Sequence, residues 1–479
     1  MSKSKSLFLF IILALGLLVR LYKFNAPLAD WHSHRQADTV SVTEIFLKTK
    51  LDLLHPKYHD LSNVQSGQEN PQGYRMVEFP IYNLINYLPI KFFHTDLVQT
   101  HRLTNIILSL LTGLVIFWLI NHFSKSYSLS ILSLSSFLFL PFNIYYSRTT
   151  LPDITATFFM VLSWYLLAKN NKLFPLSIAI SILIKPYTLI ISAPIYLYFF
   201  LKEKKLLKYF VYALVTLAPF ILWRLWIKQF PEGIPASNWL LNNSTNQVFP
   251  AWYKGHDLSW LNKIIAFRPY WFYWLFQDRL SILILGSFGL VPLFFGLGFK
   301  NKYLQPLTFC HLLGIFLYFV IIAGGNIQHD YYQILIIPSL TIILGQGFYY
   351  LLNFFTLPKP LSFLVFIFLI VFSIYFSWSR VKTYYVINNW SIIKAGEYAN
   401  KNLPQEAIVI APYNGDTAFL FQIHRQGYPT EIYNLETIKT LINQPLYFVS
   451  VNNDQYRQYL SKQSKLIYSE TDFNIYDLN

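Results

Sequence analysis

Residues 6–38 read SLFLFIILALGLLVRLYKFNAPLADWHSHRQAD, an apolar run that leads directly into a dense polar stretch. The apolar part is long enough to cross a membrane. Lys3 and Lys5 precede it and no small-residue cleavage site ends it, so we expect a retained first helix at about 6–22 with its lysines on the cytoplasmic side. The polar part, Asp30–Asp38, holds two carboxylates, two imidazoles and one guanidinium. Because titratable groups next to lipid are costly, we interpret this stretch as the chemical centre of the chain.

The composition of the whole chain indicates a membrane protein with many spans. Of its 479 residues, 54% are hydrophobic and only 13% are charged, which excludes an ordinary soluble enzyme. The formal net charge of +15 lies mainly in short loops between apolar segments, so it indicates membrane topology and not a nucleic-acid partner. Cys310 is the single cysteine, which excludes an intramolecular disulfide and a cysteine-based metal cluster.

Further apolar segments extend the first span into a polytopic bundle of about eleven passes. They lie at about 102–122, 128–146, 152–168, 174–201, 207–227, 281–299, 304–323, 331–354 and 360–378. Lys185-Pro186 interrupts the segment 174–201, and because proline stops or kinks a helix we expect two shorter segments there. A shorter apolar run at 80–94 is typical of an interfacial or re-entrant helix.

The basic residues assign a side of the membrane to each loop. The loops expected inside carry Lys125, Lys169, Lys172, Lys202, Lys204, Lys205, Lys208, Lys300, Lys302 and Lys359. The short outside loops carry only Arg148 near 147–151 and neither lysine nor arginine at 324–330, as the positive-inside rule requires. The same assignment puts the polar stretch on the external face, together with Glu78, Asp153, Lys185 and His329.

Two parts of the chain differ in character. Residues 1–380 form the transmembrane part, with external loops at 23–101 and 228–280. The second loop is rich in tryptophan and tyrosine, which favours aromatic helices along the membrane surface. Residues 381–479 alternate helical and strand-like patterns, so we predict a small extracytoplasmic α/β domain. Its clearest elements are a helix at 392–402 and strands at 407–411 and 446–449.

Asp38 is the first candidate for a catalytic base. If the polar stretch is helical, Asp38 lies one turn from both Arg35 and His34. A carboxylate held by such donors at a membrane surface suits a general base, whereas the structural alternative is a capping and salt-bridging cluster at the end of a span. Asp30 stands just before the cluster, where helix capping is the ordinary role, and it is a second candidate.

Asp153 and Glu78 are the other external acids of interest. Asp153 follows Pro152 where an outward span ends and an inward one begins, so it is either catalytic or a favourable charge at a helix N-terminus. Glu78 precedes Phe79-Pro80 at the start of the short apolar run. It is a candidate for binding the substrate.

Lys185 and the stretch His329-Asp330-Tyr331-Tyr332-Gln333 suggest an anionic ligand. Lys185 interrupts an apolar run on the outer side, where positive charge is disfavoured, so it either binds an anion or snorkels to the interface. The stretch that begins at His329 opens a late span on the same side. It is either part of an anion or sugar pocket or an aromatic belt with a satisfied histidine. As a metal site it is poor, because its spacing offers only two plausible ligands.

Five short motifs occur in an order that resembles a known family. They are Arg35-Gln36-Ala37-Asp38, Glu78-Phe79-Pro80-Ile81-Tyr82, Arg102, Leu151-Pro152-Asp153 and His329-Asp330-Tyr331-Tyr332. Over about residues 1–380 the chain resembles the bacterial membrane glycosyltransferases of the GT-C fold. Relatives of these enzymes include the dolichyl-phosphate-mannose protein mannosyltransferases and the aminoarabinose transferase of lipid A. The resemblance implies an all-α polytopic membrane fold, to which the small external α/β domain is added.

The resemblance also implies a reaction. Such enzymes transfer a sugar from a polyprenyl-phosphate carrier to a hydroxyl of a lipid, protein or glycan outside the cytoplasmic membrane. They commonly carry an acid in the first external loop with an arginine three residues on. Aligning Arg35 on that arginine places His32 at the usual acid position. We therefore expect Asp38 as the base, with Asp30 and Asp153 as alternatives, and Asp153 matches a second acidic position of this fold.

The chemistry of the donor limits what the site needs. The departing phosphate is stable as an anion, so one carboxylate to take the acceptor proton and cations to hold the phosphate are enough. A single displacement would invert the configuration at the anomeric carbon of the transferred sugar. The expected donor-binding residues are Arg35, His32, His34, Glu78, Arg148, Lys185, His329, Tyr331 and Tyr332. We expect neither a metal nor another cofactor.

Two other classes of protein are alternatives. A transporter or flippase of polyprenyl-linked sugars needs polar residues distributed through its spans, whereas the spans here are largely free of charge. A non-catalytic scaffold that presents the C-terminal domain would leave the acidic and basic clusters without a purpose. Both alternatives are therefore less favoured than an enzyme.

Overall fold

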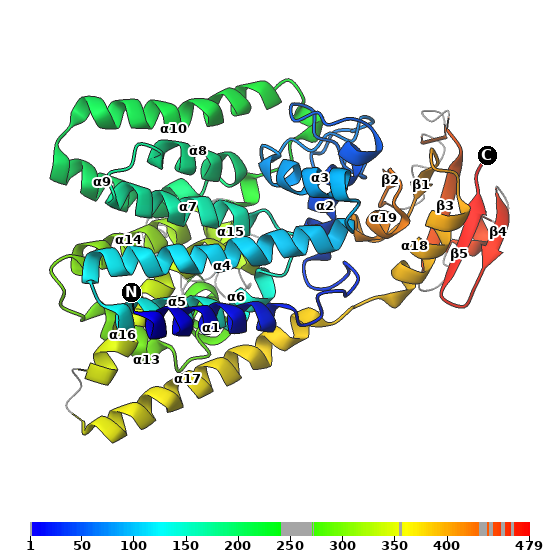
Figure 1. Ribbon diagram of the computed structural model, residues 1–479. Helices are drawn as coiled ribbons and strands as arrows, with labels where there is room; N and C mark the ends of the chain where they lie inside the picture. Colours follow the sequence, from blue (N-terminus) through cyan, green and yellow to red (C-terminus); the bar gives the residue numbers. More distant parts are fainter. Residues whose placement is uncertain are drawn as a thin grey trace, which may run out of the picture. The chain divides into compact units, whose positions relative to one another are not determined.

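The computed structural model describes residues 2–240, 271, 273–353, 357–430, 438–439, 444–451, 456–460 and 464–479 (Figure 1). The chain divides into two compact units. The first comprises Met1–Phe24, Arg102–Leu222 and Ser237–Tyr384, and the second comprises Asn25–His101, Trp223–Ala236 and Tyr385–Asn479. Most of the first predicted external loop thus shares a unit with the C-terminal residues. The aromatic helices expected at 228–280 lie largely outside the described residues.

The first unit is built from helices, and each predicted apolar segment falls on one or more of them. They are α1 (Lys3–Arg20), α4 (Leu97–Ser124, whose first turn belongs to the second unit), α5 (Tyr127–Phe139), α6 (Pro141–Tyr146), α7 (Asp153–Ala168), α8 (Phe174–Ile184), α9 (Thr188–Glu203), α10 (Leu206–Ile227), η2 (Asn238–Leu240), η5 (Tyr273–Ile284), α13 (Leu290–Leu297), α14 (Leu304–Ile321), α15 (Ala323–Gln328), η6 (Asp330–Ile336), α16 (Ile337–Asn353), α17 (Lys359–Val381) and η7 (Lys382–Tyr385). The break expected at Lys185-Pro186 separates α8 from α9.

Several helices have the length and composition of membrane spans. Within the described residues five helical segments are long and apolar enough to cross a membrane, namely Leu97–Ser124, Leu206–Ile227, Leu304–Ile321, Asp330–Asn353 and Lys359–Asn402. Shorter apolar helices are Tyr127–Phe139, Asp153–Ala168 and Phe174–Ile184. The chain is thus a helical, multi-pass membrane protein, and the count of about eleven spans stays a prediction.

One predicted span differs in detail. Residues 281–299 form two pieces, the end of the π-helical η5 and α13, and Gly286 lies between them with φ +54°. A Cβ at Gly286 would lie 2.0 Å from the backbone oxygen of Ser373 in α17. The Ser373 hydroxyl also donates to the Leu285 carbonyl, which accepts from the Gly289 amide as well. Close packing against α17 therefore explains why this segment is not one straight helix.

Glycines also bring α16 close to its neighbours. A Cβ at Gly345 would lie 2.1 Å from the Ser133 hydroxyl of α5, and one at Gly347 would lie 1.6 Å from the Pro292 carbonyl oxygen of α13. Small residues allow helix backbones to approach closely where lipid supplies no hydrophobic drive. These contacts place α16 inside the first unit, and nearly all of its side chains are buried.

The second unit contains a sheet and several helices. Its elements are α2 (Ser33–Lys48), α3 (Ile81–Phe93), η1 (Pro231–Gly233), α18 (Trp390–Asn402), β1 (Ile408–Ile410), α19 (Ala418–Ile423), β2 (Gly427–Tyr428), β3 (Leu446–Val451), α21 (Arg457–Leu460), β4 (Lys465–Ser469) and β5 (Phe473–Asp477). The strand order is β2-β1-β3-β5-β4, with β1 parallel to both neighbours and β5 antiparallel to both of its own. The predicted α/β character of the C-terminal residues is confirmed.

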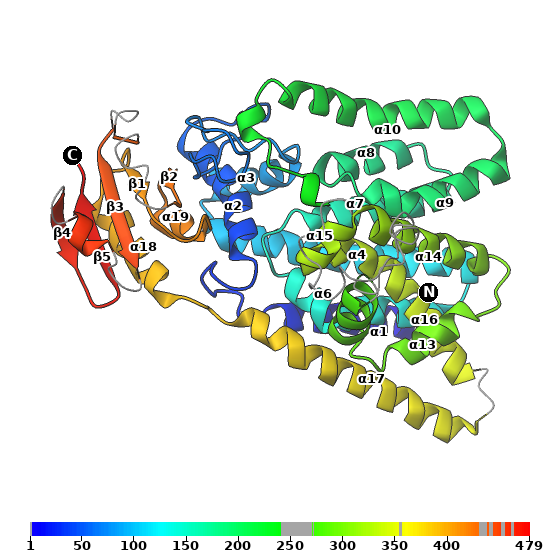
Figure 2. The same cartoon turned by 180° about the vertical axis from the view of Figure 1, so that it is seen from behind.

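The segment after α2 adds to the edge of this sheet. Asp60 forms a parallel bridge with Gly427 of β2, because the Leu61 amide donates to the Gly427 carbonyl and the Gly427 amide donates to the His59 carbonyl. One hydrophobic core of this unit includes Ala37 and Val40 of α2 together with side chains of α18, α19 and the sheet. Figures 1 and 2 both show α19 beside α2. This packing fixes the predicted polar stretch against the α/β part of the chain.

Candidate active site

Asp38 lies in the middle of a buried ion-pair cluster in the second unit. The predicted helix through the polar stretch is confirmed as α2, and the Asp38 side chain on it is 1% exposed. Arg75 Nη2 lies 2.8 Å from Asp38 Oδ2, and the Thr417 hydroxyl donates to Asp38 Oδ1 over 2.6 Å. The expected pairing with Arg35 one turn away is not what the structure shows. Arg75 and Thr417 instead contact one carboxylate oxygen each and fix the orientation of the carboxylate.

Arg35 pairs with a different acid. Its guanidinium forms a buried ion pair with Glu78, which lies just before α3. Arg35, Asp38, Arg75 and Glu78 line one small cavity of about 10 Å³. That volume holds about one water molecule. We call these four side chains and Thr417 the Asp38 cluster. It combines two carboxylates with two guanidiniums around a small space.

Asp60 and Asp416 are further acids of this unit, which sequence reasoning did not single out. Burial raises the pKa of Asp60 to about 7, against hydrogen bonds from Ser62, and it raises the pKa of Asp416 to about 6. The charge of Asp38 contributes to both increases. Burial and the nearby Asp38 thus favour the neutral forms of Asp60 and Asp416, whereas Glu78 is paired with Arg35.

Asp30, His32 and His34 surround the start of α2. Asp30 is buried and accepts a hydrogen bond from the Gln36 side chain over 2.9 Å. His32 is the N-cap residue, in a left-handed conformation with φ 56°, so the capping position expected for Asp30 belongs to His32. Burial and the neighbouring His32 lower the pKa of His34 to about 4, so His34 is neutral at pH 7.

A second cluster lies in the first unit. Asp153, fully buried in the first turn of α7, lies 2.9 Å from the Lys185 ammonium between α8 and α9. Neither Asp153 oxygen accepts a well-oriented hydrogen bond from the described residues, so each keeps a lone pair to offer. The Lys185 ammonium also lies over the rings of Tyr331 and Tyr332, 5.4 and 4.8 Å from their centroids. We call these four residues the Asp153 cluster.

Lys185 is buried and paired, so it does not snorkel to an interface. It is 7% exposed, and charged and aromatic groups surround its ammonium. A buried cation is stable only when paired in this way. Asp153 keeps the position expected for a charge at a helix N-terminus and adds the ion pair to it.

The remaining predicted residues lie around this cluster or apart from it. His329 is half-buried, with its ring 5.4 Å from that of Tyr331 and 5.3 Å from that of Trp239. Arg148 is buried and donates to the Lys23 carbonyl over 3.0 Å, which ties the end of α6 to the segment after α1. Asp330, which follows His329, accepts hydrogen bonds from the hydroxyls of Tyr146 and Tyr384.

The predicted residues are thus divided between the two units. The second unit holds Asp30, His32, His34, Arg35, Asp38 and Glu78, and the first unit holds Arg148, Asp153, Lys185, His329, Tyr331 and Tyr332. Sequence reasoning missed Arg75 and Thr417, which no local spacing connects to Asp38. A search for three grouped His, Cys, Asp or Glu side chains with metal-site geometry finds none among the described residues.

Comparisons with known proteins give the fold. No protein-family model matches the sequence, and no curated protein sequence matches it. The structure of ArnT from Cupriavidus metallidurans bound to undecaprenyl phosphate is similar, with a TM-score of 0.62 and 10% identity over 98% of this chain and 98% of that chain. Its apo form gives a TM-score of 0.63 and 9% identity over 100% of this chain and 99% of that chain. The apo oligosaccharyltransferase of Archaeoglobus fulgidus gives 0.58 and 11% identity over 100% of this chain and 75% of that one.

These identities are low, but the similarity extends over almost the entire chain. ArnT is a lipid A aminoarabinose transferase, and both proteins are membrane enzymes of the GT-C fold. The likeness includes the C-terminal residues as well as the helices. The chain therefore has the GT-C fold.

Proposed function

We propose that this chain is a membrane glycosyltransferase that uses a polyprenyl-phosphate-linked sugar as donor. The acceptor is a hydroxyl of a lipid, protein or glycan on the external face of the cytoplasmic membrane. The observation that carries the proposal is a GT-C fold over the whole chain that encloses buried carboxylate–cation pairs. One of the similar structures has undecaprenyl phosphate bound, which supports a lipid-phosphate donor.

Asp38 is the proposed base. It takes the proton of the acceptor hydroxyl while the acceptor oxygen bonds to the anomeric carbon and the bond from that carbon to the phosphate oxygen breaks. Arg75 and Thr417 support this role, because each contacts one carboxylate oxygen of Asp38, fixes its orientation and leaves further lone pairs for the acceptor. A single displacement of this kind inverts the anomeric carbon. Asp153 and Asp30 are the alternatives for the same role.

Arg35 of the Asp38 cluster and Lys185 of the Asp153 cluster are each a candidate partner of the departing phosphate. Arg35 offers a planar fork that suits phosphate oxygens, and Lys185 offers a point charge beside two tyrosine rings. Each cation is held by a carboxylate, which keeps its position fixed before the donor arrives. Donors that are preorganised in this way stabilise charge as it develops on the phosphate.

The test uses the full-length protein in nanodiscs with a panel of labelled polyprenyl-phosphate sugars and cell-envelope glycan acceptors. Acceptor-dependent release of free polyprenyl phosphate, with the label appearing on the acceptor, is the expected result. Asp38→Asn should lower this rate by about 10²–10⁴-fold, the usual contribution of a general base. Glu69→Gln, at an exposed acid of the same unit, is the matched control and should retain the rate.

Different results would exclude different parts of the proposal. Movement of intact donor between leaflets without its cleavage would replace the enzyme by a flippase. A wild-type rate in Asp38→Asn would remove Asp38 as base and pass the role to Asp153 or Asp30.

A further inference from the structure

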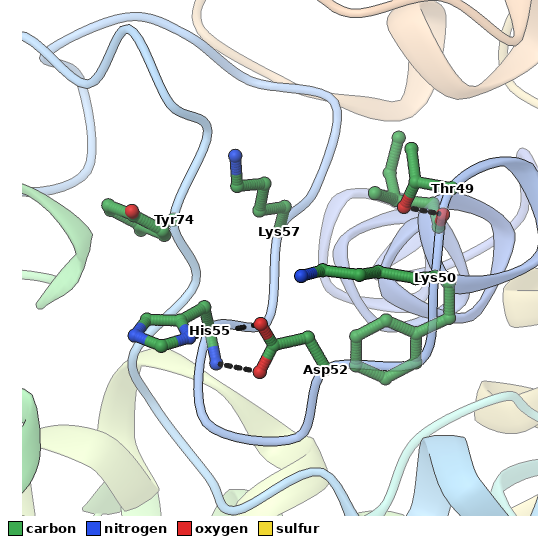
Figure 3. Close-up of a pocket in the computed structure, with 8 residues that line it drawn as sticks. Thr49, Lys50, Asp52, His55, Lys57 and Tyr74 are labelled. Atoms are coloured by element: carbon green, nitrogen blue, oxygen red, sulfur yellow. Dashed lines mark hydrogen bonds and ion pairs between the residues drawn. The ribbon is translucent and has the colours of Figure 1, made fainter.

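An open cavity of about 410 Å³ in the second unit lies apart from the Asp38 cluster and has no role in the mechanism above. It is lined by two apolar side chains of α2 and by Thr49, Lys50, Asp52, His55, Lys57 and Tyr74 (Figure 3). This volume lies within the range of small-molecule sites, which combine an apolar wall with a few polar groups. The cavity therefore has the size and lining of a ligand site.

Two lysines give the cavity its charge. Figure 3 shows Lys50 extending between Lys57 and the pair formed by Asp52 and His55. The Lys57 ammonium lies 2.9 Å from the Gln72 side-chain oxygen and 5.3 Å from the Tyr74 ring centroid, which holds it in place. The Lys50 ammonium has no hydrogen-bond or ion-pair partner among the described residues. An ammonium with nothing to bind in a cavity is a donor available to an anion.

The acid of the cavity does not neutralise Lys50. Asp52 accepts hydrogen bonds from the backbone amides of Leu54 and His55 and from the His55 ring, over 3.1–3.2 Å. Burial would raise the pKa of Asp52, but these bonds outweigh it and hold the pKa below its usual value. The Asp52 carboxylate is therefore engaged in the turn from Asp52 to His55, where it positions the His55 ring.

Aromatic rings make one wall of the cavity rigid. The His55 ring lies 5.5 Å from that of Trp226 and 5.3 Å from that of Phe230, and the Tyr74 ring lies 5.1 Å from that of Phe230. These rings pack edge to face, with interplanar angles of 64°, 90° and 60°, which holds the His55 and Tyr74 rings in place. The C–H groups of a sugar ring pack favourably on the face of an aromatic ring.

Helix α2 connects this cavity to the proposed base. Ile45 and Phe46 line the cavity from the same helix that carries Asp38. Seven or eight residues along a helix correspond to about 10–12 Å. An acceptor longer than one sugar would thus reach both places along one helix.

We propose that this cavity binds a sugar unit of the acceptor that carries an anionic group, either a phosphate or a carboxylate. The proposal rests on the proposed function. Lys50 and Lys57 bind the anionic group, and Tyr74 packs against the sugar ring. The site thereby selects acceptors with a charged sugar near the hydroxyl that is modified.

The test measures binding without any donor, so that it does not depend on transfer. Saturation-transfer NMR on the full-length protein in zwitterionic nanodiscs, with glucose 6-phosphate, glucuronic acid, glucose and inorganic phosphate as probes, gives the dissociation constants. Both anionic sugars should bind about tenfold more tightly than glucose or inorganic phosphate. Lys50→Gln should weaken their binding about tenfold, the value of one charge-assisted hydrogen bond.

Two controls accompany this measurement. Lys50→Arg should retain the binding, and Lys91→Gln, at an exposed lysine of α3, should leave it unchanged. Equal affinity for glucose, equal affinity for inorganic phosphate, or an unchanged affinity in Lys50→Gln would overturn the proposal. Binding of the anionic sugars in a protein without transferase activity would instead leave this site standing and remove the proposed function.

Discussion

Each acid with a proposed role in catalysis or donor binding in the two clusters is paired with one cation. The pairs are Asp38 with Arg75, Glu78 with Arg35, and Asp153 with Lys185. Removing one member of a buried pair leaves an uncompensated charge and costs about 3–5 kcal/mol, whereas a change that keeps the charge does not. Tests of these residues are therefore sharpest when the charge or a single hydrogen bond is changed by itself.

Thr417 offers such a test, because its hydroxyl donates to Asp38 and otherwise has only a longer contact, of 3.2 Å, to the His34 carbonyl oxygen among the hydrogen bonds of the described residues. Thr417→Val keeps the shape of the side chain and removes one hydrogen bond to the carboxylate. We expect the turnover rate to fall about tenfold with little change in the KM for the donor, since a hydrogen bond to a charged group contributes about 1.5–3 kcal/mol. Thr417→Ser keeps the hydroxyl and should restore most of the rate. An equal loss in both variants would show that Thr417 acts only by packing.

Lys185 is tested by the same logic in the first unit. Lys185→Ala leaves Asp153 charged without its partner and removes a cation from the proposed phosphate site. We expect the KM for the lipid donor to rise at least tenfold, while Lys185→Arg keeps the charge and loses less. Donor titrations in a transfer assay separate KM from the turnover rate. A donor KM that does not change in Lys185→Ala would make this lysine structural.

Only part of this residue-level arrangement was predictable from the sequence. The density of charge in Asp30–Asp38 marks the stretch, because charge is rare in this chain. The partners of Asp38 were not predictable, since Thr417 is separated from it by 379 positions and no periodicity spans that distance. We expected Asp38 to pair with Arg35 one turn away. This was wrong, because the partners of Asp38 come from more distant parts of the chain.

Among the elements, α2 is held at its C-terminal end by a polar cluster around Glu44. The Glu44 carboxylate lies 2.6 Å from the Lys48 ammonium and 3.0 Å from the His424 ring. It lies 3.5 Å from the His59 ring. Burial opposes the charge on Glu44, but the facing His59, His424 and Lys48 hold its pKa well below the usual range. This cluster joins α2, the segment after it and the residue that ends α19.

His59 makes this junction sensitive to pH. Burial lowers the pKa of His59 to about 4, against the facing Glu44, while Lys48, His424 and Asp38 also act on it. An unfolded histidine titrates near 6.5, so between about pH 6.5 and 4 the unfolded chain binds a proton that the folded chain does not. The contribution of His59 to the free energy of unfolding is thus present above pH 6.5 and is lost as the pH falls, by about 3 kcal/mol at pH 4.

The prediction is that His59→Phe makes the melting temperature of the full-length protein less dependent on pH. Thermal unfolding in detergent at several pH values between 7 and 5 measures it. The wild type should lose stability more steeply than the variant over this range. His94→Phe replaces an exposed histidine and should follow the wild type. Parallel curves for His59→Phe and the wild type would contradict this role of His59.

At the scale of elements, periodicity and composition predicted the helices, the main strands and the interruption at Lys185-Pro186, but not the interruption at Gly286. The run at 281–299 is mostly apolar, so we expected one span there, although Gly286, Ser287 and Pro292 fall within it. The break at Gly286 follows from the backbone of α17, which approaches it from a distant part of the chain. Interruptions of this kind depend on packing partners and have no signal in the local pattern.

For the whole molecule, the proposed function requires the second unit to lie outside and the lysine-rich loops inside. In a Cys310→Ala background, Gln68→Cys should react with a membrane-impermeant maleimide in intact spheroplasts. Lys204→Cys should react only after the membrane is permeabilised, because its loop follows the positive-inside rule. Both positions are exposed in the structure. Labelling of Lys204→Cys from outside would invert the topology and remove the proposed site from the external face.

The fold class was predictable at this scale, whereas the grouping of the segments was not. Long apolar runs dictate membrane helices whatever their partners, and the C-terminal alternation of patterns dictates an α/β arrangement. That the residues around Asp60 extend the edge of that sheet follows from backbone bonds to Gly427, which leave no side-chain pattern around Asp60. Position 427 itself requires glycine, because a Cβ there would lie 1.9 Å from the Val409 carbonyl oxygen.

The bridge between Asp60 and Gly427 has a consequence for how the protein is made. The ribosome produces α2 and Asp60 early, and every described helix of the first unit except α1 follows before Gly427 and Thr417 emerge. Until then Ala37 and Val40 lack the partners that bury them, so the second unit is completed only at the end of synthesis. A chain that stops before β1 would insert its helices and yet carry an incomplete Asp38 cluster. The order of synthesis thereby delays assembly of this cluster until the spans are in place.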